Sequence, residues 1–281
     1  MTSNYIKTFI RIYLVIFLVN VMWLGYEWLF LCQVKPVLLF FKPDVFVSVL
    51  LSGGFAAYLS NHPQLFLLPD LLFIVLNLLP PLFILNKSRF SFIPAYTTPF
   101  YNLFYASLYN TYGIISIETF APLILLPVLF AAKKQTDFIW RAEILRYGVI
   151  VLIVSAGIWK LREQGFLHKN NMSAILQFQH ATYLAMFPKS LKATIINYLI
   201  FHPSVSYLFY IGATILELLF AFGFLTRKLD RYLLLLLIVF VTSNYLIMHI
   251  NYFFWLLFGP LFSLPRNKSE LSIKGLHSLP G

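Results

Sequence analysis

Long apolar runs, separated by short polar segments, cover most of this chain. A helix needs about 20 consecutive apolar residues to cross the ~30 Å hydrocarbon core of a bilayer, and most of these runs approach that length. The pattern therefore predicts a series of membrane-spanning helices. We expect them at residues 9–31, 45–59, 65–85, 114–132, 146–165, 205–225 and 231–249.

The segments between these runs have other patterns. Residues 86–112 are rich in Tyr, Ser, Thr and Asn, which predicts a loop and then an aromatic helix that faces protein or a cavity. Residues 133–146 are expected to form a basic loop, and residues 175–187 an amphipathic or re-entrant segment. Residues 251–264 either complete the last span or form a separate half-span. The pair Pro80-Pro81 should kink or stop its helix, because each proline removes a backbone donor.

Composition supports a membrane protein. The 281 residues are 60% hydrophobic and only 11% charged, whereas soluble domains carry about 25% charged residues. A membrane β-barrel would show alternating segments of ~10 residues, which the long unbroken apolar runs exclude. We predict an all-α, polytopic integral membrane helical bundle of about six to eight spans. It forms one domain over residues 1–265, followed by a polar tail at 266–281.

The net charge of +11 does not change this picture. The basic residues lie in short loops, where Lys and Arg ordinarily fix the orientation of a membrane protein, so nucleic-acid binding is not expected. Residues 133–146 and 226–231 should share one side of the membrane, which we assign to the cytoplasm. Residues 161–204 should then lie on the opposite side. We expect a multi-pass protein of the cell membrane, or of the inner membrane in a bacterium.

Several kinds of chemistry lack their sequence signals. Cys32 is the single cysteine, so the chain cannot form an internal disulfide or a CxxC pair. No His-x-x-His, Glu-x-x-His or Cys-rich pattern occurs, so we expect no metal site. No Gly-rich phosphate loop and no Gly-x-Ser-x-Gly motif is present either.

Lys160 ends one apolar run directly after Trp159. Such a pair can be an interfacial anchor, since Trp lies at the level of the lipid head groups and Lys extends outward. It can also place an amine at the mouth of a cavity, where partial burial lowers the pKa of a lysine. The residues alone leave both interpretations open.

Glu217 lies deep in a span that has no cation of its own. An ionisable side chain there costs about 2.5–3.5 kcal/mol on insertion scales, so it needs a partner, a cavity or a proton. Thr214 and Tyr210 precede it by one and two turns on the same helical face. Glu217 can be a protonated or lysine-paired residue that clamps two helices. Alternatively it is a general base, or a group that tunes a lysine.

His249 closes the last long apolar run. Tyr245 lies four residues before it and Tyr252 three residues after it, so a continuous helix would gather the three on one polar face. A packing histidine with satisfied hydrogen bonds is the default interpretation. A position beside a ligand pocket is the functional one.

The second half of the chain carries four motifs in order. They are YGVIVLIVSAGIWKL at residues 147–161, Gly165, Glu217 in the middle of a span, and a histidine followed by aromatic residues at 248–253. Over residues 146–264 this arrangement resembles the membrane domain of vitamin K-dependent gamma-glutamyl carboxylases and their bacterial HTTM relatives. The first half matches only as a run of spans.

This resemblance implies a quinone or quinol as cofactor. In the carboxylases a lysine at the position of Lys160 is the proposed base that deprotonates reduced vitamin K. Lys160 would then be a neutral amine facing a quinol, and Glu217 and His249 match without an assigned role. The carboxylases continue into a large extramembrane domain that binds peptide, whereas this chain ends soon after its last span. We therefore expect a quinone-like pocket rather than carboxylation of a protein.

The SAGIWKL segment and the span with Glu217 are also similar to DoxX- and MauE-type membrane proteins. Those proteins are shorter, typically with four spans, and are linked to quinone-coupled oxidation or to disulfide maturation of partner proteins. This second resemblance implies a non-catalytic membrane partner of a redox or surface protein.

Two hypotheses of different classes follow. The first is a quinol-dependent membrane enzyme, with Lys160 as base, Glu217 tuning it and His249 near the pocket. Its cofactor would contact the aromatic residues Trp159, Tyr210, Tyr245 and Tyr252. The second is a membrane scaffold that binds a membrane or extracytoplasmic protein through residues 161–204. Transport of a lipid or small molecule is a third possibility, for which the sequence shows no gate.

Overall fold

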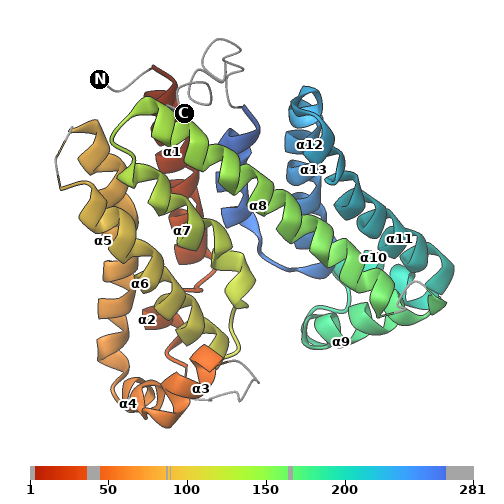
Figure 1. The fold of residues 1–281 in the computed structure, drawn as a ribbon. Helices are drawn as coiled ribbons and strands as arrows, with labels where there is room; N and C mark the ends of the chain where they lie inside the picture. The colour runs from red at the N-terminus through yellow and green to blue at the C-terminus, as the bar shows by residue number, and fades with distance from the viewer. Residues whose placement is uncertain (1–3, 37–44, 87, 89, 164–166, 264–281) are drawn as a thin grey trace.

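The computed structural model describes residues 4–36, 45–86, 88, 90–163 and 167–263, and these form helices with no strand among them. The all-α prediction is confirmed. Figure 1 shows two groups of helices joined by the long helix α8, Gln135–Arg162, which crosses the molecule diagonally. The expected tail at 266–281 lies outside the described residues.

The first group is packed through aromatic side chains. Its long helices are α1 (Asn4–Tyr26), α5 (Leu67–Leu85) and α6 (Phe92–Thr111). Phe73 of α5 stacks on Tyr105 of α6 with ring centroids 4.3 Å apart. Around these helices lie the shorter elements α2 (Leu31–Val34), α3 (Val45–Ser52), α4 (Phe55–Asn61), η1 (Pro63–Phe66), η2 (Ile117–Phe120), α7 (Ala121–Leu125) and η3 (Leu126–Ala131).

The second group follows α8 in the chain. Its elements are α9 (Asn171–Met186), α10 (Leu191–Phe201), α11 (Pro203–Leu219), α12 (Phe222–Leu225), η5 (Arg227–Leu229), α13 (Asp230–Ser243) and the π-helical turn η6 (Asn244–Met248). The chain then returns to the first group through the 3₁₀-helix η7 (Phe253–Ser263), which packs against α1, α7, α8 and α13. Of the segment expected at 251–264, Phe253–Ser263 therefore forms a separate element rather than the end of the preceding helix.

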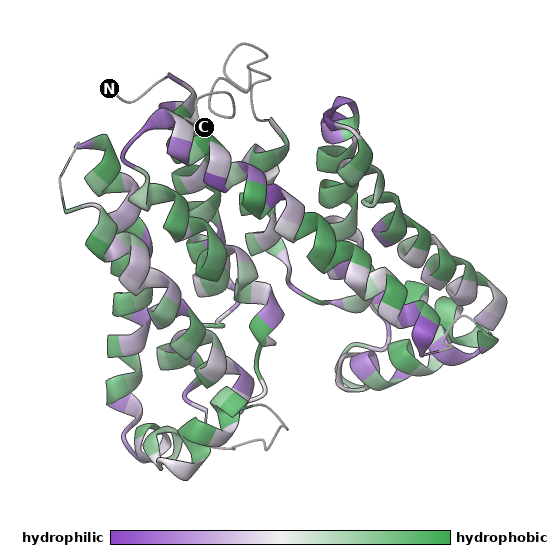
Figure 2. Ribbon diagram, in the orientation of Figure 1, coloured by the Kyte–Doolittle hydropathy of each residue, from purple (hydrophilic) through white to green (hydrophobic). Residues whose placement is uncertain are grey.

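Five of the described helical segments are long and apolar enough to cross a membrane: Asn4–Val34, Pro63–Leu85, Gln135–Arg162, Pro203–Leu225 and Arg227–Met248. Figure 2 shows apolar residues along the outer faces of these helices, where a soluble protein would be polar. The chain thus has the make-up of a multi-pass membrane protein. The number of such helices among the described residues is below the six to eight expected from the apolar runs.

Two expected spans are broken in the structure. Residues 45–59 divide into α3 and α4 at Gly53-Gly54, where Gly54 adopts φ +68°, a left-handed conformation that ends an α-helix. Residues 114–132 divide into η2, α7 and η3, with Pro122 and Pro127 at the starts of the second and third pieces. Their missing backbone donors explain why one continuous helix does not form.

One further expectation was wrong. Residues 133–146 are not a loop, because α8 begins at Gln135 and buries Phe138, Ala142 and Arg146 at successive turns. Of the two outcomes expected at Pro80-Pro81, a stop is excluded, since α5 continues through both residues to Leu85. The helix α9 covers the expected segment 175–187, and α6 matches the aromatic helix expected within 86–112.

Arg146 is fully buried and lies at the centre of a charged cluster. Its guanidinium Nη2 donates to Asp230 Oδ1 and to the Gly223 carbonyl oxygen at 3.0 Å. Glu143 Oε1 lies 3.8 Å from Arg146 Nη1 and accepts a hydrogen bond from Arg227 Nε at 2.8 Å. The cluster ties the start of α8 to the turn between α12 and α13. It places residues 133–146 and 226–231 at the same end of the molecule.

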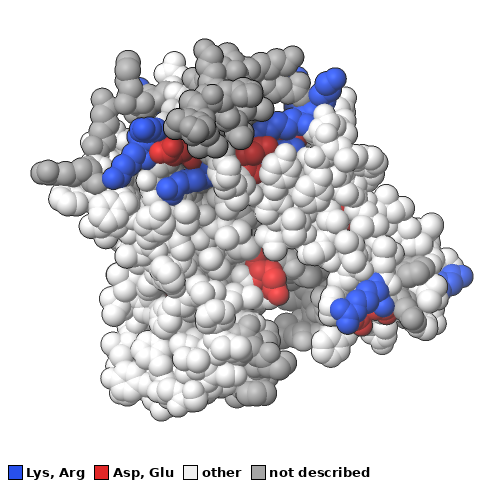
Figure 3. Space-filling view, viewed as in Figure 1, with Lys and Arg blue, Asp and Glu red and all other residues white. Residues whose placement is uncertain are grey.

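That end also carries most of the exposed or half-exposed cations among the described residues. Figure 3 shows Lys and Arg side chains gathered along the edge where α8 begins. The Tyr5 and Phe138 rings, 6.3 Å apart, place the start of α1 there as well. The exposed or half-exposed cations described at this end are Lys7, Arg11, Lys133, Lys134, Arg141, Arg227, Lys228 and Arg231.

We predict that Arg146→Met lowers the free energy of unfolding by about 3–5 kcal/mol, because it leaves the buried Asp230 carboxylate without its cation. Thermal unfolding of the purified protein in detergent measures the loss. Arg146→Met combined with Asp230→Asn should recover most of it, and Lys133→Met, an exposed site, should change little. Equal melting temperatures for Arg146→Met and Lys133→Met would contradict the prediction.

We predict that the basic end faces the cytoplasm, since Lys and Arg near span ends are retained there. In a Cys32→Ser background, a membrane-impermeant maleimide should label Lys189→Cys on intact bacterial cells. Lys134→Cys should react only after permeabilisation. The reverse pattern would invert the orientation, and labelling of both from outside would contradict the assignment of opposite sides.

Candidate functional site

Two helix ends meet between the two groups, and both carry a residue in the left-handed conformation. Helix α1 ends at Tyr26, and Trp28 follows at φ +55°. The π-helical turn η6 ends at Met248, and His249 follows at φ +53°. Residues other than Gly rarely adopt this backbone conformation. For a bulky residue such as Trp it costs about 1–3 kcal/mol. Such strain concentrates at functional sites.

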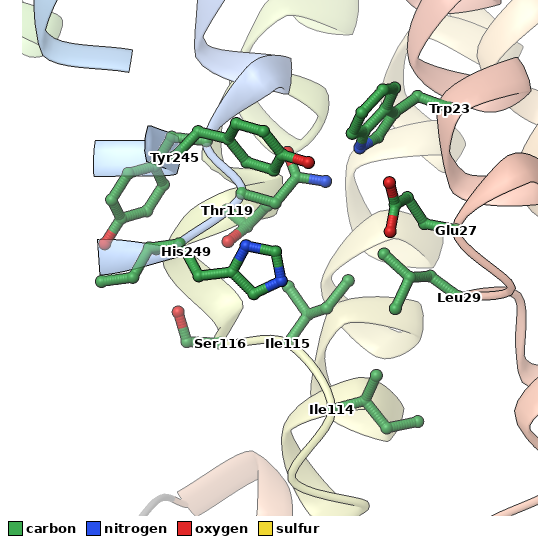
Figure 4. A pocket seen from close by; sticks show the side chains of 12 residues that line it. Trp23, Glu27, Leu29, Ile114, Ile115, Ser116, Thr119, Tyr245 and His249 are labelled. Atoms are coloured by element: carbon green, nitrogen blue, oxygen red, sulfur yellow. The ribbon is translucent and has the colours of Figure 1, made fainter. Parts of the chain in front are cut away.

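A cavity of about 420 Å³ lies between these helix ends, within the range of small-molecule sites. Three segments that are far apart in the sequence form its walls (Figure 4). They contribute the side chains of Trp23, Glu27, Leu29, Ile114, Ile115, Ser116, Thr119, Tyr245, His249, Ile250, Asn251 and Tyr252.

One wall is aromatic. The Trp23 indole meets the Tyr245 ring edge-on, with centroids 5.5 Å apart, and the Phe253 ring at 5.4 Å. The Trp23 Nε1–H is buried and has no hydrogen-bond partner among the described residues. A buried donor without a partner costs about 1–3 kcal/mol, so a ligand acceptor at this point would relieve the cost.

The His249 imidazole enters the cavity beside Tyr245, with the two ring centroids 5.5 Å apart, and faces Trp23 and Glu27. Lys192 Nζ of α10 lies 3.1 Å from His249 Nδ1, and the His180 ring lies 6.5 Å away. Burial, and then the positive charge of Lys192 and the neighbouring His180, hold the pKa of His249 below its usual value, against an opposing effect of Glu27. His249 is therefore neutral at pH 7.

Glu27 faces this imidazole across the cavity. Figure 4 shows its carboxylate and the His249 ring both directed into the space between the walls. Within the described part of the chain Glu27 forms no salt bridge. Burial raises the pKa of the nearby Tyr252 to about 12, with Glu118 and Glu217 adding to it, so this phenol stays protonated. The cavity thus combines an acceptor carboxylate with several donors.

Asp70 fixes the backbone that carries Glu27. Its carboxylate accepts hydrogen bonds from the backbone N–H of Leu31 and of Cys32, at 3.3 and 2.8 Å, at the start of α2. Tyr105 donates its hydroxyl proton to Asp70 Oδ1 at 2.6 Å, and Tyr109 donates to the Leu29 carbonyl at 2.8 Å. A buried carboxylate with several donors requires no cation, and here it anchors the turn beside the cavity.

Lys160 and Glu217 meet at a different place, between α8 and α11. Lys160 Nζ lies 2.6 Å from Glu217 Oε1, and it lies 6.0 Å from the centroid of the Tyr210 ring. The Glu217 side chain is 3% exposed, and the Lys160 side chain 30%. Gly157 permits the close approach, because a Cβ there would lie 3.2 Å from Glu217 Cβ and 3.1 Å from Leu218 Cδ2.

Trp159 belongs to neither site. Its side chain is exposed, and the Arg162 guanidinium carbon lies 4.8 Å from its ring centroid. This is the arrangement of an aromatic residue at a membrane interface, beside a cation that reaches the head groups.

The site residues predicted from the sequence therefore do not form a single site. Tyr245, His249 and Tyr252 line the cavity, whereas Lys160, Glu217 and Tyr210 do not. The three cavity residues do not share a helical face, because the helix ends at Met248 and His249 turns the chain. Trp23, Glu27 and Lys192 were not predicted as site residues. Glu27 could have been singled out as an acidic residue within the first apolar span. The partners of Trp23 and Lys192 depend on the tertiary fold.

Among the described residues, no group of three or more His, Cys, Asp and Glu side chains is placed to hold a metal ion. No family model, curated protein or solved structure matches the chain.

We predict that Lys160→Met destabilises the protein more than Glu217→Gln does. The first change leaves a buried carboxylate without its cation, at a cost of up to about 3–5 kcal/mol. The second leaves an ammonium group that already reaches solvent. Thermal unfolding should show the order, with the double variant close to wild type and Lys169→Met, an exposed site, as the control. If Lys160→Met is the more stable of the two, the pair does not clamp α8 to α11.

Proposed function

We propose that this membrane protein binds the head group of a lipid-soluble quinone or quinol in the cavity between Trp23, Glu27 and His249. The observation that carries the proposal is a cavity with aromatic walls in which polar groups from opposite sides face each other. One of these groups, the Trp23 Nε1–H, is a buried donor that has no partner in the part of the chain that the structure describes.

The chemistry of the walls fits this ligand class. A quinone head group is a flat ring with two oxygens on opposite edges, so it requires aromatic or aliphatic surfaces and hydrogen-bond donors near its oxygens. Trp23 and Tyr245 provide the aromatic surface, and Leu29 and Ile115 the aliphatic one. The Trp23 indole N–H and the Tyr252 hydroxyl provide donors.

Glu27 is the proton acceptor in this proposal. A carboxylate that faces a quinol hydroxyl can accept its proton, which is the role that the resemblance to the carboxylases gives to Lys160. Lys160 is held by Glu217 and does not line the cavity. We therefore retain a quinol as the ligand and assign the role of base to Glu27, at the end of α1, instead of Lys160 on α8.

The test uses the purified protein in nanodiscs. Lipid extraction and mass spectrometry should find a quinone at near-stoichiometric amount. A water-soluble short-chain quinone should quench tryptophan fluorescence as it binds. Trp23→Phe should weaken this binding about three- to tenfold, because it removes one hydrogen-bond donor and keeps the aromatic surface. Glu27→Gln should leave quinone binding largely intact and weaken binding of the reduced quinol.

Lys160→Met with Glu217→Gln is the matched control, since it alters a polar pair outside the cavity. Unchanged quinone affinity in this variant, together with weaker binding in Trp23→Phe, supports the cavity as the site. A preparation with no quinone and no binding of the short-chain analogue would reject the proposal. If such a preparation instead retains a stoichiometric protein partner, the scaffold hypothesis takes its place.

A further inference from the structure

We infer that Lys192 is a positioning residue that fixes the tautomer of His249, so that the imidazole presents an N–H to the oxygen of a ligand in the cavity. The inference rests on the proposed function for the ligand. It adds a residue of α10, outside the cavity wall, to the machinery of that site.

The first step is the hydrogen bond between the two side chains. An ammonium group only donates, so at 3.1 Å from Lys192 Nζ the His249 Nδ1 must be the acceptor. A neutral imidazole that accepts at Nδ1 carries its proton on Nε2. The sequence does not distinguish the two neutral tautomers of His249. The contact with Lys192 excludes the one protonated at Nδ1.

The second step is the support of Lys192. Its ammonium lies 4.8 Å from the centroid of the Tyr183 ring of α9, a cation–π contact. Ser190, the N-cap of α10, accepts a hydrogen bond from the Ala193 backbone N–H at 3.1 Å and fixes the turn of helix that carries the lysine. These contacts hold the Lys192 side chain beside His249.

The third step is the support of His249 itself. His180 of α9 is buried, and its Nε2 lies 2.9 Å from the Ile247 carbonyl oxygen, to which it donates. This bond satisfies a carbonyl at the end of the π-helical turn, just before His249 leaves the helix. The hairpin of α9 and α10 thus holds the backbone through His180 and the ring through Lys192.

The charged and titratable groups around His249 come from four elements. They are Glu27 at the end of α1, His180 on α9, Lys192 on α10 and Tyr245 on η6. Lys192 and His180 oppose protonation of the ring, and Glu27 favours it. Loss of the Lys192 charge therefore raises the pKa of His249, since the remaining balance shifts toward Glu27.

The ligand class follows from the tautomer. With Nε2–H on one wall and the Trp23 Nε1–H on the other, the cavity offers donors to two acceptor oxygens. That pattern fits the two carbonyl oxygens of an oxidised quinone. A ligand whose polar groups only donate would find no acceptor on either of these two residues.

The test reads the tautomer directly, without any ligand. In nanodiscs with ¹⁵N-histidine, wild type should show a neutral His249, protonated at Nε2, with His249→Asn identifying its signals. Lys192→Met should give a mixture of tautomers and a His249 titration shifted to higher pH. Lys192→Arg should keep the wild-type tautomer, and Lys189→Met, an exposed lysine of the same hairpin, should change nothing.

Binding of the short-chain quinone is the second readout. Lys192→Met should weaken it about three- to tenfold at pH 7, the usual result of losing one hydrogen bond, while Lys192→Arg restores it. A single unchanged tautomer in Lys192→Met would overturn the inference even if quinone binds. If no quinone binds to wild type, the proposed function fails, and the histidine spectra alone decide the role of Lys192.

Discussion

Two ion pairs fix the long helix α8 against the second group of helices. Arg146 and Lys160 lie about 21 Å apart along α8, and each meets a carboxylate of the second group, Asp230 and Glu217 respectively. An apolar span carries such groups only when each has a partner, because an isolated charge in hydrocarbon is expensive. The pairs therefore set the rotation and the translation of α8 against α11 and α13.

Much of the fold could be predicted from the apolar runs alone. A run longer than about 20 residues has few alternatives to a helix in a membrane, so α1, α5, α11 and α13 lie close to where the pattern placed them. The failures come from local signals that a hydropathy pattern does not weigh. Gly54, Pro122 and Pro127 break two expected spans, whereas Pro80 does not break α5. Whether a proline ends a helix depends on whether neighbours satisfy the freed carbonyl, which is tertiary information.

The candidate site was only partly predictable for a related reason. Lys160, Glu217 and His249 stood out because polar residues at the ends or centres of apolar runs need an explanation. The sequence suggested that these three residues form one site. In the structure they lie in two places, because His249 turns away from its helix and Glu217 is paired with Lys160. Glu27 and Lys192 belong to segments far from His249 in the sequence, with Lys192 57 residues before it, so no spacing rule links them to it.

The return of η7 to the first group has a consequence for how the protein is made. Phe253 packs on Trp23, and Phe254 packs on Phe73 and Phe120, so the core of the first group is completed by the last helix described. During synthesis the early helices enter the membrane long before that segment leaves the ribosome. Their inner aromatic faces must be covered by lipid or by the insertion machinery in the meantime. Assembly of the cavity therefore follows the synthesis of η7, after the helices of the first group have entered the membrane.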